Sequence, residues 1–203
     1  MKGIIFTAPM VRAILEGRKT VTRRVIKRQP VSGFDELFLR EKLVGSPYRP
    51  GEVVYVKETW AQIWNQDGCL HDESDFNCPC KGCHIEYKAD TGAKYPADWP
   101  DDSTGDPCCP KWRSPRFMPE WAARSHALIK SVRPERVQEI SHEDALAEGI
   151  DSWIATLKDP SSELREQRLS VKQLAFSRLW DTLHPGSWER NDWVWRVKFK
   201  VTP

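Results

Sequence analysis

Six cysteines crowd into 41 consecutive positions in the middle of the chain, at residues 69–109. Cys80 and Cys83 have the Cys-x-x-Cys spacing with which two thiolates bind one zinc ion. Cys69 or Cys78, together with Cys108 or Cys109, could complete a tetrahedral site, and we select Cys69 and Cys109. Such a closed site leaves no position for a reacting water, so the pattern predicts a structural zinc. Thiols kept reduced inside a cell favour this metal site over a disulfide framework.

A strongly basic run lies near the N-terminus. Six of the eleven residues from Arg18 to Arg28 are Lys or Arg. Such a run is typical of a solvated face or of a strip that binds phosphate groups. Arg18, Arg23 and Arg24 are therefore candidate ligands for a phosphate or a carbonyl oxygen.

A second candidate binding segment is "KWRSPRFMPEW", residues 111–121, which interleaves cations with aromatic rings. Cations hold phosphates and aromatic faces stack on unpaired bases, so Lys111, Trp112 and Arg113 predict contact with single-stranded RNA or a nucleoside. The alternative is that Trp112 and Trp121 are core residues flanked by solvated arginines.

Composition limits the classes of protein that fit. The 203 residues allow one domain with an insertion and exclude a fusion of two enzymes. The 39% of hydrophobic residues, with ten Trp and seven Phe, exclude a disordered chain. Lys plus Arg (31) nearly balances Asp plus Glu (29), but residues 51–110 hold 12 acidic and only 4 basic side chains. The acidic middle thus differs in composition from both basic ends.

Local patterns predict the elements that hold the basic run. Thr7 as N-cap and Gly17 as terminator predict a short helix, and "KTVTRRVI" predicts an extended segment after it. "GEVVYVKETW" predicts a strand that follows a Pro-Gly turn. Residues 61–118 are rich in Pro, Gly, Asp and Cys and predict an irregular insertion, apart from a strand at "IEYKAD".

The C-terminal half carries clearer signals. "SHALIKSVRPERV" predicts a strand, and Ser141 with Asp144 predicts a capped helix that ends at Gly149, with Glu148 in its last turn. Ser170 and Gln173 form a second capping box, ahead of a helix that runs to the "HPG" break. "WVWRVKFKV" alternates apolar and mainly basic residues, as in a half-buried strand. Short strands with a few short helices predict an α+β fold built on a small β-barrel.

The segment "EGRKTVTRRV", residues 16–25, resembles the signature of ASCH domains, small β-barrels similar to the PUA RNA-binding fold. Three further stretches strengthen the resemblance: "GEVVYVKETW", "KWRSPRFMPEWAAR" with "VQEISHEDALAEGI", and "LWDTLHPGSWERNDWVWRVKFKV". Together they are similar to the longer ASCH proteins of bacteriophages and prophages. The resemblance implies one PUA-like domain over residues 1–203, interrupted by the Cys-rich insertion at 61–118, and it implies no cofactor for catalysis.

Some bacterial members of this family are amidohydrolases that remove the acetyl group from N4-acetylcytidine. By resemblance, Lys19, Thr22 and Glu148 take the catalytic positions, and Thr20 and Arg24, which complete the motif, are candidate substrate-binding residues. A Thr hydroxyl attacks an acyl group only with a base in hydrogen-bond reach, and burial can make a lysine such a base. Glu148 would orient that lysine or pass a proton to the leaving amine.

We therefore expect a protein that binds a cytidine-type nucleoside or RNA and hydrolyses its N4-acyl amide. The alternatives are a non-catalytic RNA-binding module and a structural or host-interaction protein of a phage. No sequence window approaches 18 uncharged apolar residues, and the N-terminus lacks the pattern of a signal peptide. We expect a cytoplasmic protein without a membrane partner.

Overall fold

A computed structural model describes residues 1–30, 45–64, 83–91, 112–150, 154, 157 and 170–202. Its elements are β1 (Lys2–Ile5), α1 (Ala8–Leu15), β2 (Val21–Val25), β3 (Val53–Lys57), β4 (Trp60–Trp64), β5 (Cys83–Tyr87), α3 (Lys88–Thr91), η1 (Pro115–Phe117), η2 (Glu120–Ala122), β6 (His126–Arg136), η3 (Val137–Glu139), α4 (His142–Ala147), α7 (Val171–Leu183) and β7 (Trp193–Thr202).

The fold is mixed α+β, as the sequence predicts. Five strands follow the order β1-β3-β6-β7-β2, and β4 and β5 form a separate two-stranded sheet. The larger sheet is an open one, with β1 and β2 at its two ends. The chain divides into two compact units, the first formed by residues 1–12 and 54–126 and the second by residues 13–53 and 127–202.

The first unit contains the parallel pair β1 and β3, with Lys2 opposite Val54, and the antiparallel pair β4 and β5, with Trp60 opposite Tyr87. Trp60, Met118 and Ala122 form a buried apolar cluster here. The described parts of the predicted insertion, residues 61–64, 83–91 and 112–118, contain strand β4, strand β5 with the "IEY" of the predicted strand, and the short helices α3 and η1. "KAD" belongs to helix α3 and not to the predicted strand.

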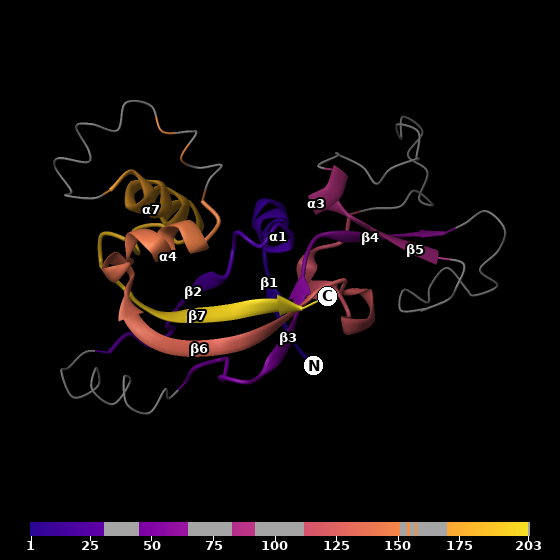
Figure 1. Ribbon diagram of the computed structural model, residues 1–203, viewed down its shortest axis with the longest axis horizontal. Coiled ribbons are helices and arrows are strands. Elements are labelled where there is room, and N and C mark those ends of the chain that lie inside the picture. Colours follow the sequence, from indigo (N-terminus) through magenta and orange to yellow (C-terminus); the bar gives the residue numbers. More distant parts are fainter. Residues whose placement is uncertain are drawn as a thin grey trace. The chain divides into compact units, whose positions relative to one another are not determined.

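The second unit contains β6, β7 and β2 together with α4 and α7 (Figure 1). β2 runs antiparallel to β7, with Thr22 opposite Val197. Alternation on β7 buries Trp193, Trp195, Val197 and Phe199, as predicted. The same strand also buries Val194.

The predicted helix ends are confirmed in this unit. The Ser141 hydroxyl accepts from the Asp144 backbone N–H at 3.1 Å, and Gly149 follows α4 at φ 75°. Ser170 and Gln173 form the reciprocal capping box of α7. Leu174, Phe176, Leu179 and Trp180 form the buried apolar face of α7, whereas its last residue, Leu183, is exposed.

Candidate functional site

Lys19 lies in the second unit, between the end of α1 and the start of β2, and its side chain is completely buried. Its ammonium donates to three oxygens: the Val21 carbonyl at 3.0 Å, the Glu148 carbonyl at 2.9 Å and the Glu148 Oε2 at 2.6 Å. An ammonium has three N–H donors, so these bonds satisfy all of them. Lys19 and Glu148, which are 129 positions apart in sequence, thus form one buried ion pair.

Burial lowers the pKa of Lys19, because desolvation disfavours the charged ammonium, and the neighbouring Glu148 carboxylate offsets that effect only in part. The positive charges of Arg24 and Arg23 lower the pKa further. A lysine in such surroundings releases a proton more readily than one in water, and this is the property a general base needs.

Glu148 is the C-cap residue of α4, and Gly149 behind it lets the helix end approach Lys19 closely. A Cβ on Gly149 would stand 2.8 Å from the Ala13 Cβ and 3.2 Å from the Lys19 Cβ. The C-terminus of a helix repels an anion, but Lys19 and Arg23 both pair with this carboxylate. Two buried cations therefore compensate a position that the helix dipole makes unfavourable.

Thr22 follows Val21, the residue whose carbonyl accepts from Lys19, and it is buried on β2. The Lys19 ammonium therefore reaches the backbone one residue before Thr22, and it donates hydrogen bonds to Val21 and Glu148. Transfer of the Thr22 proton to Lys19 would require one of these bonds to open.

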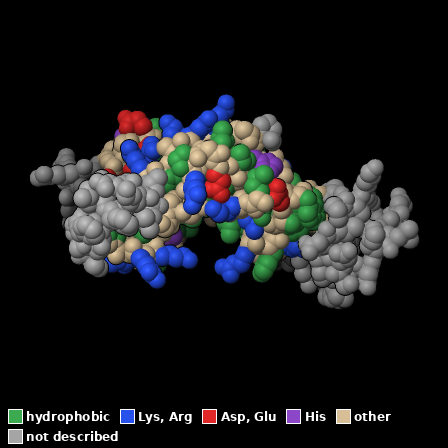
Figure 2. Space-filling model, turned by 90° about the horizontal axis from the view of Figure 1, so that it is seen from below, with side chains coloured by type: hydrophobic (Ala, Val, Ile, Leu, Met, Phe, Trp, Pro, Cys, Tyr) green, Lys and Arg blue, Asp and Glu red, His purple; other side chains and the backbone are tan. Residues whose placement is uncertain are grey.

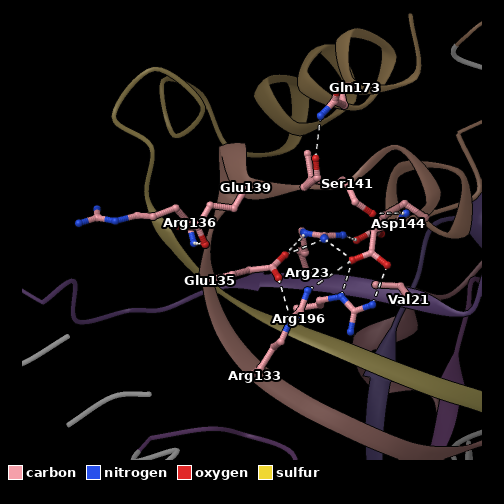
Figure 3. Close-up of polar contacts among 12 residues, drawn as sticks. Val21, Arg23, Arg133, Glu135, Arg136, Glu139, Ser141, Asp144, Gln173 and Arg196 are labelled. Carbon is pink, nitrogen blue, oxygen red and sulfur yellow. Dashed lines mark hydrogen bonds and ion pairs between the residues drawn. The ribbon is translucent and has the colours of Figure 1, made fainter. Parts of the chain in front are cut away.

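Arg23 is the centre of a buried ion-pair network (Figure 3). Its guanidinium contacts the carboxylates of Glu135 at 2.6 Å, Asp144 at 3.0 Å and Glu148 at 3.1 Å. All three of its nitrogens bond to carboxylates. The basic run suggests a ligand-binding role for Arg23, yet its guanidinium binds protein carboxylates from β6 and α4.

Further cations complete the network from two neighbouring strands (Figure 3). Arg196 on β7 donates to Asp144 Oδ1 at 2.6 Å, and Arg133 on β6 donates to Glu135 at 3.1 Å. Burial alone would raise the pKa of Asp144, but the hydrogen bonds and charges of Arg196 and Arg23 together lower it. We call Lys19, Arg23, Arg133, Glu135, Asp144, Glu148 and Arg196 the ion-pair network.

Sequence reasoning missed four members of this network: Arg133, Glu135, Arg196 and the carboxylate of Asp144. In a capping box the side chain of the third helical residue returns to the N-cap backbone. Here Asp144 supplies its backbone N–H to Ser141, while its carboxylate binds Arg23 and Arg196. The pattern therefore predicts the helix start correctly and gives no sign of the ion pairs.

The remaining predicted residues of the basic run lie outside the network. Arg18 is exposed and pairs with Glu16, two positions away. Thr20 connects two elements through its backbone, donating to the Ala147 carbonyl and accepting from Phe199 N–H, each at 2.9 Å. Arg24 is half-buried. Burial raises the pKa of Tyr48, and the positive charge of Arg24 offsets this rise in part. Burial and the charge of Arg24 both lower the pKa of His184.

The aromatic segment lies in the first unit, where Trp112 and Arg113 are half-buried and Lys111 lies outside the described residues. The Arg113 guanidinium stands 5.1 Å from the Trp60 ring centroid, and burial lowers the pKa of Arg113. Trp121 is 41% exposed, so the alternative of a fully buried core ring does not hold for it. Figure 2 shows one face of the molecule, on which Lys and Arg side chains are more prominent than Asp and Glu.

The predicted zinc site falls almost wholly outside the described residues, which include only Cys83 of its four proposed ligands, Cys69, Cys80, Cys83 and Cys109. Within the described ranges, no group of three or more His, Cys, Asp or Glu could hold a metal ion. The structural zinc stays a prediction.

Among the helices in the described ranges, none has the length and apolar character needed to cross a membrane.

The ion-pair network can have two effects. It can stabilise the second unit, and it can set the pKa of the buried Lys19, three positions before Thr22. Comparison of the chain with family models, curated proteins and solved structures found no match.

Proposed function

We propose that the second unit binds a cytidine-type nucleoside, free or within RNA, and hydrolyses its N4-acyl amide. The observation that supports this proposal is the buried pair of Lys19 Nζ and Glu148 Oε2, 2.6 Å apart, in which Lys19 also bonds to the carbonyl of Val21, the residue before Thr22. Lys19, Thr22 and Glu148 are the three positions that the resemblance to ASCH amidohydrolases implies. The small PUA-like barrel that this resemblance implies is part of the same proposal.

In the proposed reaction Lys19, in its neutral form, accepts the Thr22 hydroxyl proton while the oxygen attacks the acyl carbon. The bond between that carbon and N4 breaks, N4 takes up a proton, and cytidine leaves. Water then hydrolyses the threonine ester to release the carboxylic acid and restore the hydroxyl. Burial favours this role because it lowers the pKa of Lys19. Glu148 keeps the lysine oriented toward the β2 residues during these steps.

The test is incubation of the purified protein with N4-acetylcytidine, with deacetylation followed by chromatography. Thr22→Val preserves the shape of the side chain and removes the hydroxyl, so turnover should disappear. Thr22→Ser restores a hydroxyl and should recover part of the rate. Lys19→Ala should lower kcat by about 10²- to 10⁴-fold, the usual contribution of a general base.

Lys130→Ala is the matched control, because Lys130 is an exposed lysine on β6 of the same unit. It should retain the rate of the wild type. Wild-type turnover that survives in Thr22→Val would show that the hydroxyl is not the nucleophile, and the proposed mechanism would fall.

A non-catalytic nucleic-acid-binding module is the second candidate, and one observation favours it. Lys19 and Arg23 bond through all of their nitrogens to protein oxygens, as residues with a purely structural role do. This candidate predicts RNA binding without turnover. Its affinity should fall steeply with salt, since released counterions drive the binding of several phosphates, whereas hydrolysis of a neutral nucleoside should depend little on salt.

A further inference from the structure

We propose that the aromatic segment, residues 112–123 of the first unit, binds single-stranded nucleic acid by stacking unpaired bases on Phe117 and Trp121. The inference goes beyond the proposed function, because hydrolysis of a nucleoside in the second unit does not require this surface. It rests on the exposure of two rings, on the contacts that hold the backbone beside them, and on the cations around them.

Both rings are exposed although they stand in a short, structured segment. Phe117 is 74% exposed at the end of η1, and Trp121 is 41% exposed in η2. A single exposed apolar side chain needs no explanation. Two large aromatic rings four positions apart, on consecutive turns, are candidate positions for stacking of bases.

Buried neighbours fix the backbone that carries these rings. Met118 and Ala122, each adjacent to one of the exposed residues, are buried in the cluster with Trp60. The Tyr87 hydroxyl donates to the Ala122 carbonyl at 2.9 Å, and the Trp121 ring meets the Trp60 ring edge to face at 6.0 Å. The segment is therefore ordered before a ligand arrives, so binding does not have to order it.

Cations flank the exposed rings and make this surface positively charged. Lys57 Nζ donates to the Arg116 carbonyl at 2.9 Å, which holds an ammonium beside the backbone of Phe117. Arg116 is exposed, and its guanidinium forms no ion pair among the described residues. Glu120 is the only acidic residue in the segment, which also contains Arg113.

Exposed aromatic faces with adjacent cations match the chemistry of a single strand, in which every base offers a π-face and every linkage carries a negative charge. A duplex hides the base faces, and an acidic peptide offers charge without bases. The arrangement therefore favours a single-stranded nucleic acid over both of these ligands.

The experiment measures binding of the full-length protein to a fluorescently labelled 12-nucleotide oligouridine by anisotropy. Phe117→Ala and Trp121→Ala should each raise Kd by about 5- to 100-fold, the usual effect of losing one stacked base. Trp121→Phe keeps an aromatic ring and should recover most of the affinity. Arg116→Ala should reduce the slope of log K against log salt by about 0.7, the contribution of one phosphate on a single strand.

Leu183→Ala is the matched control, because Leu183 is 43% exposed and lies on α7 of the second unit. It should bind oligouridine like the wild type. Three results would overturn the proposal: no binding by the wild type at low salt and micromolar protein, unchanged Kd in both alanine variants, or equal affinity for a duplex or a polyglutamate peptide. Phe117→Ala should still deacetylate free N4-acetylcytidine if the proposed function holds, so the two proposals fail separately.

Discussion

Replacement of Arg23 by methionine tests whether the ion-pair network holds the second unit together. Methionine has a similar length and no charge, so Arg23→Met removes the guanidinium without leaving a large void. The change leaves Glu135, Asp144 and Glu148 without the cation that they share. We expect a strong loss of stability.

The size of the loss follows from what remains around each carboxylate. Glu148 keeps Lys19 and Asp144 keeps Arg196, but among the described residues the buried Glu135 keeps only Arg133, whose side chain is 61% exposed. Breaking a buried ion pair by removing one partner costs about 3–5 kcal/mol, because it leaves an uncompensated charge inside the protein. At about 2 kcal/mol per molar urea, the unfolding midpoint of the second unit should fall by roughly 1.5–2.5 M.

The assay is urea unfolding followed by tryptophan fluorescence, which reports on the second unit through the buried Trp180, Trp193 and Trp195. Arg133→Met is the matched control, since both guanidiniums pair with Glu135 and differ in burial. An exposed ion pair contributes about 0–1 kcal/mol, so the control should lose no more than this amount.

Equal losses in Arg23→Met and Arg133→Met would refute the reasoning, because they would show that burial does not set the strength of these pairs. A more stable Arg23→Met protein would refute it as well. Such a result would mean that desolvation of the buried charges exceeds the attraction between them.

Two further predictions concern acid and the end of α4. The pKa of Asp144 is lowered in the folded state, so the contribution of this carboxylate to stability is present above the usual carboxyl pKa and is lost as pH falls through the lowered value. Asp144→Asn should therefore flatten that part of the pH profile of the free energy of unfolding. Gly149→Ala should lower the free energy of unfolding by about 1–2 kcal/mol because of its positive φ, and further because the new Cβ meets Ala13. Gly17 has a similar φ but open space around it, so Gly17→Ala should show only the loss due to φ in the same urea assay.

Local sequence signals predict most elements of the second unit because those signals are strong over short distances. The Ser170 and Gln173 capping box and the alternation along β7 each depend on neighbouring residues alone. β5 is predicted in part, through "IEY" of the expected strand, whereas β4 is not, because its pairing joins Trp60 to Tyr87 across many intervening residues. A strand of five residues carries too little periodicity to be recognised without its partner.

For the candidate site, the residues are found from sequence more readily than their roles. A run of lysines and arginines predicts a solvated or phosphate-binding strip, yet Lys19 and Arg23 are buried. One local signal points to this burial: Arg23 has the same parity on β2 as Val21 and Val25, so the period of two places it with the apolar side chains. The acidic partners come from β6 and α4 and cannot be assigned without the tertiary structure.

All N–H donors of Lys19 are engaged, yet Lys19 can still lose a proton, because the two oxygens of the Glu148 carboxylate have different partners. Oε2 accepts from Lys19, and Oε1 accepts from Arg23. If Lys19 gave up its proton, Glu148 would keep one buried cation, so the carboxylate would not be left uncompensated. Arg23 therefore lowers the free energy of the state in which Lys19 is neutral, relative to a site where Lys19 is the only partner. The contacts that stabilise the second unit are in this way compatible with a lysine that acts as a base.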